Sequence, residues 1–586
     1  MAKQHDKTAQ PPANTNTPDP IVIVGGGFAG TTLLIHTLLQ IARDPEITEP
    51  VNIVMVERAK KNMHGGVAYG GTPNFEHNLN LSGKRITPFK QGRMPKGFPT
   101  FIEYVLKKDI EQPGMRKNLQ NVSRKLYGEY LRHLTTLALE KAKKKANVSF
   151  VYKNVKNLVE KGSEATLYMT DKSTLKASSV VLTTGFSEML VPVFAKAVQN
   201  SDHFLDSPYS DKANQAFREL DMESRHTKVL IIGTGLTSFD TAARLLHSGY
   251  QGKITMMSRH NEMHAVYGAT SDLRYLQDKL PGEPRKEKDM DFTKREPWFM
   301  QADTPEELIN LVKEEFGYLQ SQDITSEEIL QHWERYVPDV CEKFTHQEIR
   351  QLLSSFGSVI TANRVGVTPE IGNYVMGAIE AGLIDVRSAK IHTMQEKDDQ
   401  IVCGVESQEH SLFSLNFLLG KTRKEKFDLV VSGMGNNPNF DRPITDIQDP
   451  LWKNLLFAGA ATPHWTGIGV RVSKKFSMVA NDGRTSQRVA VLGVPAAGHM
   501  MTTKYAYAEK EGSGGRLSPF IMNIPGITSG IDAFLDAKYE KLTMPFKQAS
   551  AKNKTCEPVH VDKLLLREIP HKAAANNGTT RKRNHG

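Results

Sequence analysis

The stretch IVIVGGGFAG at residues 21–30 is the most informative part of this sequence about its fold. Its first four residues are apolar and β-branched, which is typical of a short strand buried on both faces of a parallel sheet. Three glycines follow, and leucine and isoleucine side chains then recur at helical spacing as far as Ile41. The run VNIVMVE at residues 51–57 predicts a second strand. Strand, glycine turn, helix and strand make a βαβ unit, which predicts an α/β fold with a parallel sheet.

The glycines of this turn have the spacing G-x-G-x-x-G, with Gly25, Gly27 and Gly30 at the three positions. The first glycine permits a tight turn, the second lets a pyrophosphate approach the backbone at the helix N-terminus, and the third lets the helix pack closely on the strand. Glu57 ends the second strand, where a carboxylate accepts hydrogen bonds from ribose hydroxyls. A purely structural glycine turn is the alternative. We favour a dinucleotide with an unphosphorylated ribose, which fits FAD and NAD alike, because a 2′-phosphate would face Glu57.

A second copy of the same architecture begins at residue 229. The strand VLII at 229–232 is followed by GTGLTS at 233–238, where Ser238 replaces the third glycine. The next strand, 254–257, ends in Ser258-Arg259 rather than in an acid. An arginine at this place can pair with a 2′-phosphate, and a hydroxyl can support it, so the pair favours NADPH over NADH. A solvent-exposed arginine at a strand end is the alternative. The residues expected to contact the second nucleotide are Gly233, Gly235, Leu236, Thr237, Ser258 and Arg259.

The two glycine motifs predict two Rossmann-like dinucleotide-binding domains. Strand-like runs at 429–431 and 455–458 are expected to complete the first sheet, so that the first domain is discontinuous and the second is inserted in it. A helical insertion is predicted in, or packed beside, the second unit, because Thr304, Thr325 and Thr345 are each followed by glutamate at the capping-box spacing (Glu307, Glu328 and Glu348). The predicted parts are a disordered tail at 1–19, an FAD-binding domain at 20–190 and 425–505, an NAD(P)-binding domain at 225–424 with its helical insert at about 300–355, a C-terminal extension at 506–570, and a disordered tail at 571–586.

The composition narrows the class of protein. The net charge is +10, but the basic runs are short and no nucleic-acid-binding motif accompanies them, so we interpret them as a solvated helix face and a frayed tail rather than as a nucleic-acid or membrane contact. No apolar run approaches the ~20 residues that span a bilayer, and residues 1–20 do not resemble a secretory signal. The three cysteines, Cys341, Cys403 and Cys556, are too far apart for a C-x-x-C dithiol. We therefore expect a cytoplasmic protein without a membrane partner, and the low cysteine count argues against a dithiol-disulfide reductase.

Shorter motifs carry a family resemblance. The motifs GVAYG at 66–70 and HNLN at 77–80 resemble a group of two-dinucleotide-binding flavoproteins, the family that contains FAD-dependent urate hydroxylases and aspartate N-monooxygenases. The second glycine motif with Ser258-Arg259 is similar to the same family. Further similar motifs are Asn363-Arg364, Pro369-Glu370, Thr184-Gly185 and residues 428–433. The resemblance extends from about residue 20 to residue 465.

The resemblance implies FAD at the first motif and a nicotinamide nucleotide at the second. Phe28 and Ala29 would contact the pyrophosphate, and Asn80 would lie near the flavin ring. The chain departs from the pattern at Phe457-Ala458-Gly459-Ala460, where many such flavoproteins have Gly-Asp, and it lacks the F-x-G-x-x-x-H signature of Baeyer–Villiger monooxygenases. The residues expected to contact FAD are Gly25, Gly27, Phe28, Ala29, Gly30, Glu57, Arg58, Asn80 and Gly459.

From these motifs we expect an FAD-dependent, NADPH-oxidising monooxygenase that hydroxylates a small molecule with O₂ through a C4a-peroxyflavin, with NADH as a second possible donor. The alternatives are an NADPH-dependent reductase or oxidase without oxygen transfer, and a non-catalytic flavin-binding sensor or scaffold. No catalytic residue and no metal ligand is assigned, because the flavin would carry the chemistry. We also expect the segment Gly459–Gly469 to close over the flavin, with a helix beginning near Gly469 and with His464 and Trp465 near the cofactor or substrate. Ordinary loop packing is the alternative for this segment.

Overall fold

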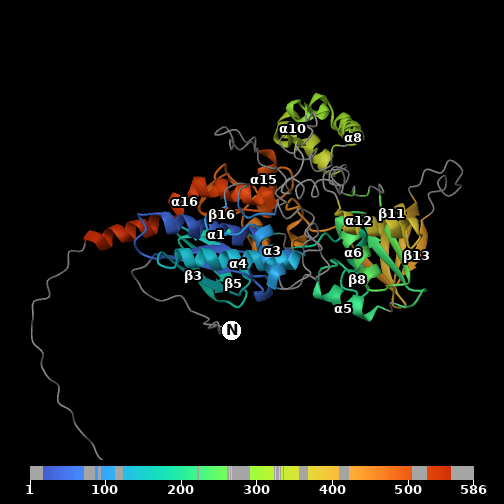
Figure 1. Ribbon diagram of the computed structural model, residues 1–586, viewed down its shortest axis with the longest axis horizontal. Helices are drawn as coiled ribbons and strands as arrows, with labels where there is room; N and C mark the ends of the chain where they lie inside the picture. Colours follow the sequence, from blue (N-terminus) through green and yellow to red (C-terminus); the bar gives the residue numbers. More distant parts are fainter. Residues whose placement is uncertain are drawn as a thin grey trace, which may run out of the picture.

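The computed structural model of the chain forms two lobes built on sheets and a third lobe built of helices (Figure 1). We call them the first lobe, which contains the glycine turn at 25–30, the second lobe, which contains the turn at 233–238, and the helical lobe, residues 291–354. The structure describes residues 18–70, 86–89, 94–111, 123–185, 188–220, 223–259, 263, 266, 291–322, 324, 329, 332–333, 336–354, 367–407, 422–503 and 524–555. The predicted terminal tails lie almost wholly outside these residues.

The first lobe is built on a six-stranded sheet with the order β15-β16-β7-β1-β2-β3. Its strands are β1 (Ile21–Val24), β2 (Val51–Val56), β3 (Ala146–Val151), β7 (Ser179–Leu182), β15 (Ser477–Val479) and β16 (Thr485–Val491). β1 lies in the middle, parallel to β2 and to β7, and only β15 runs antiparallel to its neighbour. The predicted βαβ unit is therefore confirmed.

The two faces of this sheet have different covers, as the alternation of side chains along β1 requires. Ile21 and Ile23 belong to a core shared with the helices α1, α4 and α16, whereas Val22 and Val24 belong to a core shared with α14 and the three-stranded sheet β4-β5-β6. The helices of the lobe are α1 (Phe28–Arg43), α2 (Gly66–Tyr69), α3 (Phe101–Glu111), α4 (Arg124–Ala142), α14 (Pro450–Phe457), α15 (Ala497–Thr502) and α16 (Ile524–Thr555), with the 3₁₀ helices η1 (Lys60–Asn62), η6 (Ile444–Asp446) and η7 (Val494–Ala496). The small sheet consists of β4 (Val155–Lys161), β5 (Glu164–Met169) and β6 (Thr174–Ala177).

The second lobe is built on a seven-stranded sheet with the order β13-β12-β11-β10-β9-β14-β8. Its strands are β8 (Phe204–Leu205), β9 (Lys228–Ile232), β10 (Lys253–Ser258), β11 (Ile384–Lys397), β12 (Gln400–Ser407), β13 (Arg423–Phe427) and β14 (Leu429–Ser432). Its helices are η3 (Val193–Val198), α5 (Asp211–Glu219), α6 (Leu236–His247) and α12 (Pro369–Glu380). β9 and β10 are parallel, which confirms the second βαβ unit.

Two of the strands expected in the first sheet are placed differently by the structure. Residues 429–431 form β14, which pairs with β9 and β8 of the second sheet, so the prediction that they complete the first sheet is wrong. Residues 455–457 form the end of helix α14, and Ala458 is its C-cap, so the run is not a strand. Pro450 occupies the first turn of α14, and the Asp449 carboxylate accepts hydrogen bonds from the N–H groups of Leu451 and Trp452. These start signals lie upstream of the apolar run that suggested a strand. The chain returns to the first sheet only at β15 and β16.

The helical lobe confirms one of the three predicted capping boxes in full, at Thr345, and the hydroxyl cap of a second, at Thr304, where Glu307 accepts from the Asp303 N–H instead. The Thr304 hydroxyl accepts from Glu307 N–H at 3.2 Å, and Thr345 and Glu348 exchange reciprocal bonds of 2.8 and 3.3 Å. Thr325 and Glu328 lie outside the described residues. The lobe has its own apolar core around Phe316 and Trp333. Its elements are η4 (Asp291–Lys294), η5 (Trp298–Gln301), α8 (Pro305–Ser321) and α10 (Val337–Lys343).

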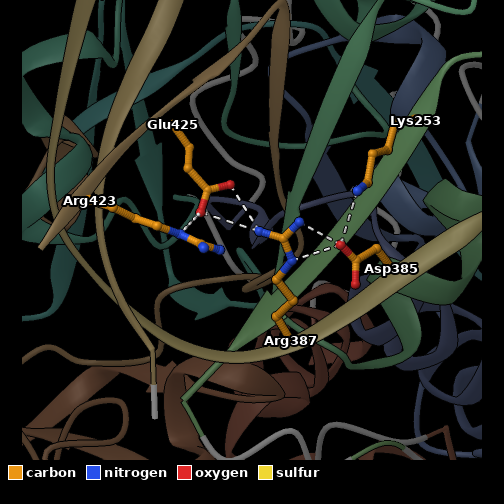
Figure 2. Close-up of polar contacts among 5 residues, drawn as sticks. All are labelled: Lys253, Asp385, Arg387, Arg423 and Glu425. Atoms are coloured by element: carbon orange, nitrogen blue, oxygen red, sulfur yellow. Dashed lines mark hydrogen bonds and ion pairs between the residues drawn. The ribbon is translucent and has the colours of Figure 1, made fainter. Parts of the chain in front are cut away.

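A row of alternating charges joins the antiparallel part of the second sheet to its parallel part (Figure 2). Arg387 on β11 donates to Asp385 at 2.7 Å on one side and to Glu425 on β13 at 2.9 Å on the other. Lys253 of β10 pairs with Asp385 at 3.3 Å, and Arg423 pairs with Glu425 at 2.8 Å. Arg387 is therefore the central cation of this row, with 21% of its side chain exposed.

Replacing Arg387 with Met is expected to lower the free energy of unfolding by about 1–3 kcal/mol, because two partly buried carboxylates lose their shared cation. Arg423→Met is the matched control: its side chain is 65% exposed, so its pair with Glu425 is expected to contribute about 0–1 kcal/mol. Urea unfolding of both variants checks this. Equal losses of unfolding free energy in the two variants would show that the central position of Arg387 in the row does not make it more stabilising than Arg423.

Candidate functional site

The first glycine turn has the geometry that its spacing predicts. Gly25 has a φ of +111°, which an L side chain rarely adopts, and its N–H donates to the Val56 carbonyl at 2.8 Å. A Cβ on Gly30 would collide with the carbonyl oxygen of Gly25 and would stand 2.7 Å from the Thr183 hydroxyl. The turn therefore brings α1 against β1 and β7 so closely that only glycine fits at either end of it.

The middle glycine of this turn leaves open space at the N-terminus of α1. Gly27 is the N-cap of α1 and provides no side-chain cap, whereas α4 and α8 are capped by the hydroxyls of Ser123 and Thr304. A Cβ on Gly27 would have Gly66 Cα, at 3.6 Å, as its nearest neighbour, which is ordinary contact. Uncapped N–H groups and the positive end of the helix dipole are what a pyrophosphate requires. The residues at this turn therefore fit a dinucleotide.

The acid at the end of β2 faces the same turn. Glu57 is 8% exposed, and its Oε2 accepts the Gly26 N–H at 2.8 Å while Oε1 accepts the Ala59 N–H at 3.3 Å. Two carboxylate oxygens have about four acceptor sites, so capacity remains for ribose hydroxyls. Arg58, the next residue, is exposed. Asn80 lies outside the described residues.

Gly459 is not brought to the glycine turn by any contact among the described residues. It follows the C-terminus of α14 with a φ of +67° and packs on the side chain of Asn481, whose N–H donates to the Gly459 carbonyl at 2.9 Å. The residue at the turn is instead Gly493, which follows β16: a Cβ on Gly493 would lie 3.1 Å from Ala29 Cβ. The sequence contained a signal for this position, because the apolar run 489–492 is followed at once by Gly493.

The helix expected near Gly469 is absent, and the prediction is wrong: residues 469–476 have no helix in the structure. The segment nevertheless lies beside the residues that follow β16, because Val470 N–H donates to the Pro495 carbonyl at 2.7 Å. Gly498 touches the same segment, since a Cβ there would stand 2.6 Å from Nδ1 of His464. His464 is thus connected to Ala29 through the short turn 493–498.

His464 is held as a neutral imidazole. Its Nδ1 lies 2.9 Å from the Thr466 hydroxyl and 3.3 Å from the Thr466 N–H, so Nδ1 is the acceptor for that N–H and the remaining proton is on Nε2. The residue is 4% exposed. Burial lowers the pKa of His464 to about 3, with smaller contributions from neighbouring cations and imidazoles such as His499 and His346.

Trp465, the next residue, connects this segment to the helical lobe. Its ring stacks on His346 with the centroids 3.8 Å apart, and its carbonyl accepts a hydrogen bond from Arg350. Arg350 also pairs with Asp441 at 2.8 Å. The helical lobe therefore covers the first lobe at the loop that contains His464.

The second glycine turn repeats the geometry of the first. Gly233 has a φ of +110°, and Gly235 is the N-cap of α6 without a side-chain cap. Leu236 and Thr237 form the first turn of α6. At the third glycine position, Ser238 is fully buried and lies against Gly433, where a Cβ would collide with its hydroxyl.

The end of β10 meets this turn as predicted. The Thr234 hydroxyl bonds to the Ser258 hydroxyl at 3.1 Å, so Ser258 lies at the turn. Arg259 is exposed at the end of the strand, and its carbonyl accepts from the Ser388 hydroxyl at 3.0 Å. The side chain of Arg259 is therefore exposed at the turn while its backbone is held by Ser388.

Two sheets with parallel centres, each with a glycine turn and an uncapped helix after a central strand (β1 and β9), define the fold of the two-dinucleotide-binding flavoproteins. Residues 22–187 match the family described as FAD-NAD(P)-binding, whose cofactors are FAD and NAD(P). No helix in the described part of the chain is long and apolar enough to cross a membrane.

Solved structures agree with this fold. Ornithine hydroxylase (PvdA) from Pseudomonas aeruginosa is 12% identical with a TM-score of 0.53, over 90% of this chain and 100% of that one. L-lysine 6-monooxygenase from Pseudomonas syringae is 12% identical with a TM-score of 0.51, over 89% of this chain and 99% of that one. DfoA, a cadaverine monooxygenase from Erwinia amylovora bound to FAD, is 11% identical with a TM-score of 0.50, over 96% of this chain and 100% of that one. A comparison with curated protein sequences gives no match.

Gly27→Ala is expected to weaken FAD binding about tenfold or more while the fold remains, because the new methyl group has room in the protein but lies where the pyrophosphate approaches; a factor of ten is ~1.4 kcal/mol. FAD titration of the apoprotein and its thermal unfolding check this. Gly30→Ala is the control and should instead cost about 1–3 kcal/mol of stability, since its methyl group has no room. Full FAD affinity in Gly27→Ala would contradict the assignment of the turn.

The buried imidazoles make stability depend on pH. Burial also lowers the pKa of His499, to about 4. Between pH ~6.5, where the unfolded imidazole titrates, and pH ~4, the unfolded chain binds more protons at these two residues than the folded chain does, so stability falls as the pH falls. We expect a slope of up to about 1.4 kcal/mol per pH unit from each histidine, and His464→Gln should remove one of the two contributions. Urea unfolding at several pH values measures the slope, and an unchanged slope in His464→Gln would contradict a neutral buried ring.

Proposed function

We propose that the protein is an FAD-dependent oxidoreductase that oxidises NADPH and hydroxylates a small molecule with O₂. The observation that carries the proposal is the pair of uncapped glycine turns in two separate lobes, because one dinucleotide site alone would not supply both an electron donor and a flavin. Bound FAD would accept a hydride from the nicotinamide and pass electrons to O₂. The chain's own residues bind and orient the two nucleotides: Gly27 and Glu57 on the FAD side, and Gly235 and Arg259 on the NADPH side.

The two cysteines that the structure describes argue against disulfide reduction, and Cys556 lies outside the described residues. Cys341 lies in α10 of the helical lobe and Cys403 lies in β12 of the second lobe, so these two thiols are on different lobes. Burial raises the pKa of each to about 12, with smaller contributions from Glu342 and Glu425 respectively. A disulfide reductase needs a thiolate beside its flavin, and neither residue offers one.

The cover over the His464 loop supports a closed substrate site. The helical lobe contacts this loop through His346 and Arg350. Such a cover would exclude water from the reacting atoms. The neutral imidazole of His464 would offer one N–H as a hydrogen-bond donor to a small substrate near the flavin. It would do so without adding a charge to the site.

The proposal is tested by anaerobic addition of NADPH to the purified holoprotein. Bleaching of the flavin absorbance near ~450 nm is expected, since a hydride donor reduces bound flavin. Absence of bleaching would favour a flavin-binding sensor. Incorporation of labelled oxygen into a product, found by screening small molecules for stimulated NADPH oxidation, would distinguish a monooxygenase from an oxidase, which would release only peroxide.

Arg259→Ala is expected to raise the KM for NADPH about tenfold or more, because a charge-assisted bond to the 2′-phosphate contributes about 1.5–3 kcal/mol and is partly screened at an open site. The KM for NADH should barely change, since NADH has no 2′-phosphate. Steady-state kinetics with both nucleotides check this, and the NADH reaction is the internal control. Equal use of NADPH and NADH by the unmodified protein would show that Arg259 does not bind a 2′-phosphate and is only an exposed residue at the end of a strand.

A further inference from the structure

A buried ion pair crosses from the first lobe to the second. Arg124 is the first residue of α4, where the Ser123 hydroxyl caps the helix by accepting the Leu126 N–H at 3.2 Å. Its guanidinium lies 3.7 Å from the carboxylate of Asp240, which is on α6 of the second lobe. The two side chains are 18% and 5% exposed. The Ser123 cap fixes the start of α4 and so the position of the Arg124 backbone. The ion pair joins this helix of the first lobe to α6 of the second lobe.

Tyr209 links the pair of Arg124 and Asp240 to the residues at the second glycine turn. The Tyr209 hydroxyl donates to Asp240 at 2.7 Å, and the Arg124 guanidinium stands 5.6 Å from the centre of the Tyr209 ring. The Tyr209 hydroxyl also lies next to Thr237, the second residue of α6. Thr237 is one of the residues at the second glycine turn, so a cation of the first lobe is connected to the turn by Asp240 and Tyr209.

Burying the charges of Arg124 and Asp240 costs free energy that offsets much of what their attraction contributes to the stability of the fold. Burial raises the pKa of Asp240, against the opposing influence of Arg124 and of Tyr209. Buried pairs are commonly replaced by apolar side chains without loss of stability, so a pair at this depth is better explained by the geometry it imposes. The chain also contains an exposed pair between the same lobes, Lys61 with Asp211 at 2.5 Å and with 47% and 72% of the side chains exposed. An exposed pair imposes little geometry, because water replaces it readily.

We propose that Arg124 is a positioning residue that holds α6 of the second lobe in register with the first lobe, so that the nicotinamide meets the flavin at the distance hydride transfer needs. This inference rests on the proposed function. Donor and acceptor atoms must approach to about 3–3.5 Å, and an error of ~1 Å costs about a hundredfold in rate. Arg124 is not one of the residues assigned above to either nucleotide site, and its partners include Asp240 and the ring of Tyr209, so its loss should lower the rate of reduction and leave nucleotide affinity nearly unchanged.

The test compares three variants: Arg124→Met, the double variant Arg124→Met/Asp240→Leu, and Lys61→Met as the matched interlobe control. Stopped-flow reduction by NADPH without oxygen gives a limiting rate and a Kd for each. We expect the limiting rate to fall about tenfold or more in the first two, with Kd within about threefold of the unmodified protein. Unfolding should show Arg124→Met destabilised and the double variant recovered, because the double variant leaves no unpaired buried charge. Lys61→Met should match the unmodified protein in all three measurements.

A second measurement does not depend on activity. Fluorescence energy transfer between labels at exposed positions 143 on the first lobe and 219 on the second should show a broader distance distribution in the double variant than in Lys61→Met. If NADPH fails to reduce the unmodified protein, the proposed function fails, and this measurement still decides whether Arg124 holds the lobes in register. A limiting rate that recovers together with stability in the double variant would overturn the proposal, as would an unchanged distance distribution. Should Arg124→Met not fold, the double variant carries the test.

Discussion

The close packing of the first glycine turn is the constraint on which the rest of the structure depends. Because Gly30 has no side chain, α1 approaches the carbonyl of Gly25, and the positive φ of Gly25 lets the chain leave β1 in the direction of that helix. The Thr183 hydroxyl bonds to the carbonyls of Val24 and Gly25 at 3.0 Å and so fastens the neighbouring strand β7 to the same turn. The open N-terminus of α1 follows from this packing, since a larger residue at Gly25 or Gly30 would move the helix away.

The second lobe has the same close packing of a helix on a glycine turn, but it achieves this packing with different residues. Ser238 occupies the third glycine position and is accommodated because Gly433, at the end of β14, leaves room for its hydroxyl. The two residues are almost two hundred positions apart in the sequence, and their fit depends on β14 pairing with β9. The strand at 429–432 therefore belongs to the lobe whose turn it completes.

Several of the contacts between lobes in the described part of the chain are polar. The helical lobe meets the first lobe through the stack of His346 on Trp465 and through Arg350, and the second lobe meets it through Arg124 and Asp240. Directional contacts fix orientation more narrowly than apolar contact does, because a hydrogen bond weakens steeply when its angle changes.

The sequence was sufficient to predict both βαβ units, the two glycine turns, Glu57 and Ser258 at their strand ends, and the capping box at Thr345 with the hydroxyl cap at Thr304. Each of these depends on residues close together in the chain, where spacing and local backbone preference are sufficient. Only the tertiary structure decided that β14 joins the second sheet, that Leu455–Ala458 ends a helix, that Gly493 rather than Gly459 meets Ala29, and that Arg124 lies beside Asp240. The reason is physical: an apolar run of four residues suits a buried strand and a buried helix equally well. Contacts with segments far away in the sequence decide which of the two forms and which segment it packs against, and a local sequence pattern contains no information on those contacts.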